Sequence, residues 1–109
     1  MKGDRLGEFE ELTLLAVCAV KEETYGVPVQ RFAEKATGRR VTMGAVYRAL
    51  DRLEDKGYVR SCMGPAAPVR GGKAKRLYEA TAEGAKVLKA LRRTRERIWQ
   101  VIEAQGGLP

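Results

Sequence analysis

The sequence predicts an α+β fold that is mainly helical, in which one small domain is followed by a single long helix. Apolar residues recur at helical spacing in three segments before residue 57, two short strand-like segments follow, and helical spacing returns after residue 82. A chain of 109 residues fits one compact domain with an appended helix. We therefore expect a domain over residues 1–81 and a C-terminal helical segment over residues 82–109.

The first helix is predicted over residues 8–20. Acidic side chains occupy its opening turn, where the helix dipole favours them. Beyond Leu12 the segment is apolar on every side, so it must be covered by its own domain and by a second subunit. We accordingly expect Leu12 and Leu15 to contact that subunit, whereas Cys18 is expected to be a small core residue.

The second helix is expected to be short and amphipathic. Thr24 is the predicted cap, Pro28 is tolerated in the first turn, and Gly38 stops the helix. The predicted buried stripe follows the spacing of one helix face and consists of Val29, Phe32, Ala33 and Ala36.

The third helix is predicted to begin at Thr42, whose hydroxyl can accept an early backbone N–H, and to end at Gly57. Its inward stripe is Val46, Leu50 and Leu53. The short connector 39–41 joins it to the second helix, and small and cationic residues face outward. This layout is that of a helix-turn-helix.

A winged-helix hairpin is predicted after Gly57, because the spacing of apolar residues becomes strand-like. Residues 58–63 and 75–80 are the predicted strands, and the segment between them is rich in glycine and proline. That loop carries Arg70 and Lys73 toward its tip, so it is interpreted as a basic wing.

The last helix is predicted to start after Thr81 and to reach about Gln105. Its stripe alternates three- and four-residue steps, which is coiled-coil-like spacing with one polar interruption, through Leu88, Leu91, Arg95, Ile98 and Ile102. The alternative is that this stripe packs back on its own domain. We expect instead a homodimer whose interface comprises Leu12, Leu15, Leu88, Leu91, Ile98, Trp99 and Ile102.

The positive charge lies in the middle third of the chain. Residues 39–76 carry ten basic side chains against three acidic ones, and the resulting +7 equals the net charge of the whole protein. A localised cationic surface indicates a polyanionic partner, although basic solvated faces are also common.

Several classes of function lack support in the sequence. It contains no histidine, its two cysteines are far apart, and no phosphate-binding loop or nucleophile beside a base is present. We therefore expect no enzyme activity, no metal and no cofactor. Cys62 is expected to be an exposed thiol, and the alternative of a redox-sensing role lacks a resolving partner nearby. The longest apolar run, residues 12–20, is too short to cross a bilayer and lacks a basic leader, so a cytoplasmic location is expected.

Double-stranded DNA is the predicted partner, and the third helix is predicted to enter its major groove. Thr42, Gly44 and Ala45 allow close approach, while Tyr47 and Arg48 lie beside the groove. Further cationic contacts are expected from Arg39, Arg40, Arg52, Arg70, Lys73, Lys75 and Arg76. As alternatives, Tyr47 packs under its helix, and Arg48 and Arg52 are solvated or pair with Asp51 and Asp55.

Two motifs resemble those of the PadR family. They are Tyr47-x-x-Leu50-x-x-Leu53-Glu54-x-x-Gly57 and Tyr78-x-x-Thr81-x-x-Gly84, accompanied by Leu14-Leu15 and Tyr25-Gly26, so that the resemblance covers about residues 8–90. It implies a dimeric transcriptional repressor that binds an inverted-repeat operator and is released by a small molecule or another stress signal. The single C-terminal helix resembles the short branch of the family.

The resemblance also bears on Trp99, the one tryptophan in the chain. Some members of the family bind flat aromatic drugs between tryptophans at the dimer interface, so Trp99 is either part of a ligand site or an interface anchor. Two other functions remain open for the whole protein. One is a winged-helix module that binds an acidic protein, and the other is an architectural DNA binder without sequence preference.

Overall fold

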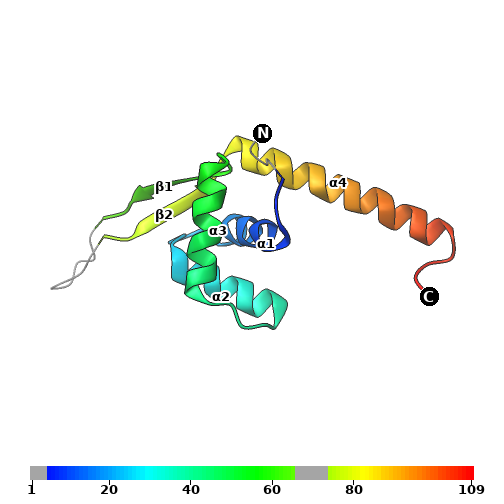
Figure 1. The fold of residues 1–109 in the computed structure, drawn as a ribbon, viewed down its shortest axis with the longest axis horizontal. Helices are drawn as coiled ribbons and strands as arrows, with labels where there is room; N and C mark the ends of the chain where they lie inside the picture. The colour runs from blue at the N-terminus through cyan, green and yellow to red at the C-terminus, as the bar shows by residue number, and fades with distance from the viewer. Residues whose placement is uncertain (1–4, 66–73) are drawn as a thin grey trace.

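The computed structural model describes residues 5–65 and 74–109 and confirms the α+β, mainly helical fold. The elements, in chain order, are α1 (Glu8–Ala19), α2 (Gly26–Thr37), α3 (Met43–Asp55), β1 (Val59–Met63), β2 (Arg76–Ala80) and α4 (Ala82–Ala104). Three short helices form the body, the β1–β2 hairpin extends from one side of it, and α4 projects toward the other side (Figure 1). This is the winged-helix arrangement with an appended helix.

The core lies where α1, α2, α3 and β1 meet. It is built from Leu14, Val29, Val46, Leu50, Leu53 and Val59, all of which are fully or almost fully buried. The predicted inward stripe of α3 is confirmed. Since burial of one such side chain contributes about 1.5–3 kcal/mol, these contacts are the main attraction between the three helices.

The hairpin is antiparallel, with a register from Val59 opposite Ala80 to Met63 opposite Arg76. The other edge of β2 pairs with the α1–α2 connection, because the Tyr78 N–H donates to the Thr24 carbonyl at 2.8 Å. This pairing explains an error in the sequence prediction. Thr24 does not cap α2, since it lies beside β2 and its hydroxyl donates to the Val20 carbonyl, and Tyr25 occupies the cap position.

Two predictions about buried residues were wrong. The buried residues of α2 are Gly26, Val29 and Ala33, whereas Phe32 is 40% exposed and Ala36 is also exposed. Phe32 and Ala36 lie to one side of the stripe that faces α1 and α3, because each residue turns the helix by about 100°. Cys18 is likewise exposed, since α1 turns Leu14 and Val17 toward the core.

The start of α4 is fixed to the turn between α3 and β1. The Thr81 hydroxyl donates to the Gly57 carbonyl at 2.6 Å, and the Thr81 N–H donates to the Tyr58 carbonyl at 3.0 Å. Gly84 packs so closely on the Tyr58 carbonyl that a Cβ would overlap its oxygen. The second sequence motif therefore has a physical basis, because Thr81 caps α4 and Gly84 permits the contact.

Beyond this contact, α4 extends away from the body for most of its 23 residues. Much of its apolar surface is uncovered in the single chain, notably at Ile98, Trp99 and Val101. Within residues 5–65 and 74–109, no helix is both long enough and apolar enough to cross a bilayer.

A partly buried ion pair links the start of α1 to the end of α3. Glu10 Oε1 lies 2.7 Å from Lys56 Nζ, and the same carboxylate accepts the Gly7 N–H that precedes α1. Burial acts to raise the pKa of Glu10, but the hydrogen bonds from Lys56 and Gly7, together with the charges of Lys56 and Arg52, outweigh it and lower this pKa. Ionised Glu10 therefore stabilises the folded state.

We predict that Glu10→Gln lowers the free energy of unfolding at pH 7 by about 1–3 kcal/mol, because Lys56 and the Gly7 N–H lose a charged acceptor. Since the folded-state pKa of Glu10 is lowered, its contribution is present above the ordinary value of 4.5 and is lost as the pH falls through the lowered value. Urea unfolding followed by circular dichroism should show the two proteins converging in acid. The matched change Glu79→Gln, in the exposed Arg60–Glu79 pair, should have little effect. An equal deficit at pH 3 and pH 7 would contradict the role of the charge.

Candidate nucleic-acid interface

The N-terminal end of α3 presents a small, accessible surface. Thr42 caps the helix by accepting the Ala45 N–H at 3.1 Å, as predicted. Thr42 and Gly44 are exposed and Ala45 is half-buried. None of these three residues has a bulky side chain that would keep a ligand away from the end of the helix.

Tyr47 lies next to this end of α3 and is 44% exposed. Its ring rests against Gly26, the first residue of α2, so closely that a Cβ on Gly26 would overlap the phenol. Tyr47 is therefore half-buried against α2, in keeping with the alternative that it packs partly under its helix, and its exposed part remains accessible. Sequence reasoning did not assign Gly26 a role, although a glycine opening a helix is a signal of close packing.

Arg48 and Arg52 are exposed, and within the described residues neither forms an ion pair with Asp51 or Asp55. The guanidinium of Arg48 lies back along α3, where its Nη1 atom would be 3.4 Å from a Cβ on Gly44. Arg48 thus adds a positive charge directly beside the small surface.

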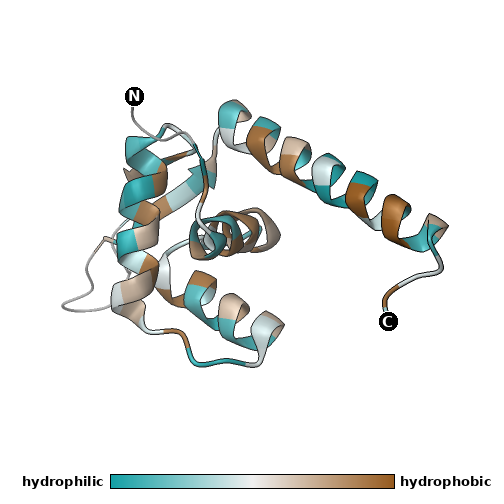
Figure 2. Cartoon of the chain, turned by 45° about the vertical axis from the view of Figure 1, so that its right-hand side comes forward, coloured by the Kyte–Doolittle hydropathy of each residue, from teal (hydrophilic) through white to brown (hydrophobic). Residues whose placement is uncertain are grey.

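The connector between α2 and α3 is held by α2. Gln30 Nε2 donates to the Val41 carbonyl at 2.7 Å, and the Val41 N–H donates to Glu34 Oε2 at 2.9 Å. The connector runs along the same edge of the body as the start of α3 in Figures 1 and 2. Arg39 and Arg40 are exposed on it and precede the cap of α3 by only a few residues.

Two further cations adjoin this connector. Arg31 and Lys35 on α2 line one shallow hollow together with Arg39 and Arg40. The sequence prediction did not include Arg31 or Lys35, because on α2 they were indistinguishable from an ordinary solvated helix face.

The base of the wing is held by side-chain contacts that sequence reasoning did not anticipate. Lys75 Nζ lies 4.0 Å from the centre of the Tyr25 ring, a cation–π geometry. Arg76 donates to the Ser61 hydroxyl at 2.9 Å, and Ser61 donates to Glu54 at 2.8 Å. Both cations are therefore oriented by the domain. Arg70 and Lys73 lie outside the described residues.

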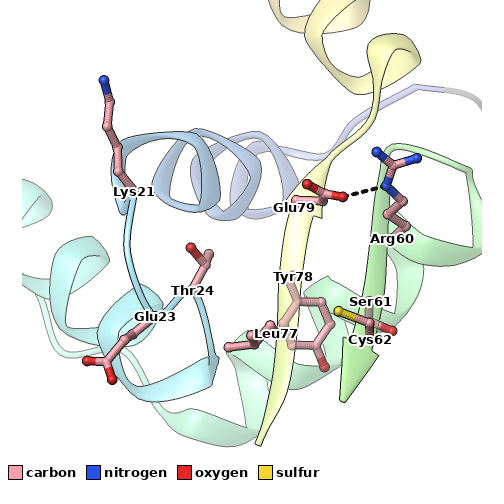
Figure 3. A pocket seen from close by; sticks show the side chains of 9 residues that line it. All are labelled: Lys21, Glu23, Thr24, Arg60, Ser61, Cys62, Leu77, Tyr78 and Glu79. Carbon is pink, nitrogen blue, oxygen red and sulfur yellow. Dashed lines mark hydrogen bonds and ion pairs between the residues drawn. The ribbon is translucent and has the colours of Figure 1, made fainter. Parts of the chain in front are cut away.

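A second hollow lies over the hairpin and the α1–α2 connection (Figure 3). Arg60 and Glu79 form an ion pair of 2.6 Å at its edge, which neutralises the charge of Arg60. Cys62 is exposed beside them, in agreement with the prediction for this thiol. The hollow is lined by Lys21, Glu23, Thr24, Arg60, Ser61, Cys62, Leu77, Tyr78 and Glu79.

The residues predicted to form a dimer interface differ in exposure. Leu15, Ile98 and Trp99 are each about half exposed, and Leu91 and Ile102 are intermediate. Leu12 and Leu88 instead pack partly against the core of their own chain. The single chain thus covers the part of the predicted dimer interface nearest its core. It leaves the C-terminal half of α4 uncovered, where Figure 2 shows apolar bands on a helix that has moved away from the body.

Among residues 5–65 and 74–109, no three or more acidic or cysteine side chains form a group that could hold a metal ion.

The sequence profile of the transcriptional regulator PadR-like family matches residues 14–90. Among solved structures, a PadR-like transcription factor from Bacteroides fragilis has a TM-score of 0.71 at 18% identity, over 90% of this chain and 89% of that one. A PadR family regulator from Clostridium difficile has a TM-score of 0.66 at 25% identity, over 93% and 100%. Bacillus subtilis PadR in complex with operator DNA has a TM-score of 0.62 at 18% identity, over 76% and 46%. No curated protein sequence matches the chain.

We predict that Gly26→Ala displaces the Tyr47 ring while leaving the fold intact, because the added Cβ overlaps the phenol and the half-exposed ring is free to rotate away. The Tyr47 ring signals, assigned with Tyr47→Phe, should shift in aromatic carbon–proton NMR spectra. Gly44→Ala is the matched control, since its Cβ would meet Arg48 only at an ordinary contact distance. Unchanged Tyr47 signals in Gly26→Ala would show that the two residues do not pack as described.

Proposed function

Because the chain belongs to the PadR-like family of transcriptional regulators, we propose that it binds an operator in double-stranded DNA through α3 and the wing. The observation that carries the proposal is the N-terminal end of α3, where Thr42, Gly44 and Ala45 leave room for a base edge beside the exposed Arg48. A winged helix that presents this end to the major groove is a known mode of DNA recognition.

The cations around α3 support the same proposal. Arg39 and Arg40 flank one end of the helix, and Lys75 and Arg76 lie at the base of the wing. In the proposed complex these side chains bind phosphates and fix the register of α3, while Tyr47, Arg48 and Arg52 lie at or beside the groove. Arg70 and Lys73 are proposed as phosphate contacts from their place in the sequence.

We expect Arg48→Ala to reduce the preference for the operator over random DNA by about 1–3 kcal/mol for each half-site, which is the range for loss of one good base contact. Operators are first selected from a random duplex library with the wild-type protein, and affinities are then measured by fluorescence anisotropy. Equal losses on selected and random DNA would show that Arg48 contacts only phosphate.

The double change Arg39→Ala and Arg40→Ala should weaken binding to all duplexes alike. It should reduce the salt slope by about 2 for each subunit, or about 4 for the proposed dimer, since about 0.9 is lost for each phosphate contact. Lys86→Ala with Arg93→Ala removes the same charge from the exposed surface of α4 and should leave the slope nearly unchanged. An unaltered slope in the first variant would place the connector outside the DNA interface.

The proposed functional unit is a homodimer joined through α1 and α4. The support is the coiled-coil-like spacing of the α4 stripe and the uncovered side chains of Leu15, Ile98 and Trp99. Such a dimer would place two copies of α3 on an inverted repeat, with half-sites about one helical turn or a multiple of it apart. The alternative remains that the stripe packs against its own domain, as Leu88 does.

We predict that the wild-type protein is a dimer by light scattering at micromolar concentration and that Ile98→Asp makes it a monomer with unchanged helix content, because a carboxylate would be buried in the apolar seam. Gln100→Asp, on the opposite side of α4, is the matched control and should remain dimeric. A wild-type monomer would overturn the proposed dimer.

Regulation and location follow as parts of the same proposal. We propose repression in the cytoplasm, without enzyme activity or cofactor, relieved by a small-molecule effector or another stress signal. Trp99 beside Leu15 and Leu88 offers an aromatic wall for an effector, and quenching of its fluorescence by aromatic compounds would test this role.

Two other functions give different results in the same assays. An adaptor that binds acidic proteins would lack the steep salt dependence on duplex DNA, and an architectural DNA binder would show that dependence without enriching any sequence.

A further inference from the structure

Arg95 is the one polar residue in the coiled-coil-like stripe of α4, and it has a partner. Its Nη2 atom lies 2.9 Å from Glu11 Oε1 on α1, 84 positions earlier in the chain. The Glu11 side chain is only 18% exposed, whereas that of Arg95 is 61% exposed. We propose that the Glu11–Arg95 pair becomes enclosed when two copies of the chain associate and that it fixes the register of the dimer. This inference rests on the proposed homodimer.

The pair lies beside three apolar side chains. Leu15, Leu88 and Trp99 line one groove of about 340 Å³ together with Glu11 and Arg95, where α4 passes over α1. The charged residues Lys89, Arg92 and Glu96 of α4 complete its lining. Farther along α4, the exposed Ile98 continues this face. A partner that covers Leu15 and Ile98 must therefore also cover most of Arg95.

The charges of the two helices indicate a second copy as the occupant. The first turn of α1 is acidic, and the middle of α4 is rich in arginine. Glu10, Glu11, Arg92 and Arg95 form ion pairs within the chain. Among the described residues, Glu8 on α1 and Arg93 and Arg97 on α4 have no ion-pair partner. One chain therefore carries both an acidic and a basic helix segment beside apolar side chains. In a symmetric pair of chains, the acidic segment of each copy can face the basic segment of the other. A partner that is only acidic or only basic would complement one of the two segments and repel the other.

Enclosing an ion pair has a characteristic energetic pattern. Desolvation offsets much of the attraction, so replacing both partners by apolar residues leaves an interface as strong or makes it stronger. Removing one partner leaves the other charge uncompensated and weakens the interface. The benefit of such a pair is specificity, since a polar residue in a coiled-coil seam excludes registers in which it has no partner.

The test is a double-mutant cycle on dimerisation, measured by analytical ultracentrifugation. Glu11→Gln should raise the dimer dissociation constant about tenfold, a discounted value because Arg95 retains some exposure in the single chain. Glu11→Leu with Arg95→Leu should leave the constant unchanged or lower it. The charge exchange Glu11→Arg with Arg95→Glu should restore most of the loss seen in Glu11→Gln.

Register is measured separately, on operators whose half-sites are moved apart in single base-pair steps. The wild type should favour one spacing, and the double-leucine variant should bind several spacings with affinities within about threefold of one another. Glu83→Gln is the matched control, because Glu83 pairs with Lys86 at an exposed site on the same helix.

The outcomes separate this inference from the proposed function. A wild-type monomer would overturn the proposed dimer and, with it, the inference. A wild-type dimer whose dissociation constant is unaffected by Glu11→Gln would overturn only the role of the pair. A weaker dimer in the double-leucine variant, or an unaltered spacing preference, would show that the pair contributes strength instead of register.

Discussion

The contact of Gly84 with the Tyr58 carbonyl fixes the position of α4 relative to the domain formed by α1, α2, α3 and the hairpin. Thr81 adds hydrogen bonds to Gly57 and Tyr58, so the first turn of α4 is fixed on the turn that follows α3. The direction in which α4 leaves the domain is thereby fixed relative to the end of α3. In the proposed dimer the junction therefore sets the separation of the two DNA-reading helices, and a side chain at position 84 would force the two elements apart.

Contacts within the fold determine which basic side chains are oriented, which are neutralised and which stay unpaired. Lys75 is held over Tyr25, Arg76 is tied to Ser61, and Arg60 is neutralised by Glu79. The arginines beside α3, in contrast, have no ion-pair partner among the described residues. These arginines are thus free to meet phosphate beside the end of α3, whereas the domain orients Lys75 and Arg76 before any phosphate is bound.

The same molecule leaves apolar surface exposed on α1 and on the distal half of α4. A domain of this size has too small a core to cover a 23-residue helix as well. Leu88 packs against that core, but Ile98 and Trp99 lie beyond its reach. The direction in which α4 departs therefore decides which apolar residues the chain covers itself and which stay exposed.

The order of the elements and most of the core were determined by the sequence alone, because Val46, Leu50 and Leu53 follow helix periodicity and Thr42 and Thr81 are strong local caps. Local patterns did not decide which side of a short helix faces the core. Phe32 and Cys18 were therefore misplaced, and Thr24 proved to belong beside β2. The fit of Tyr47 on Gly26, the wing contacts and the Glu11–Arg95 pair required the tertiary structure. Each joins residues from different elements, and their distances depend on how the helices pack, which no periodicity within one segment can specify.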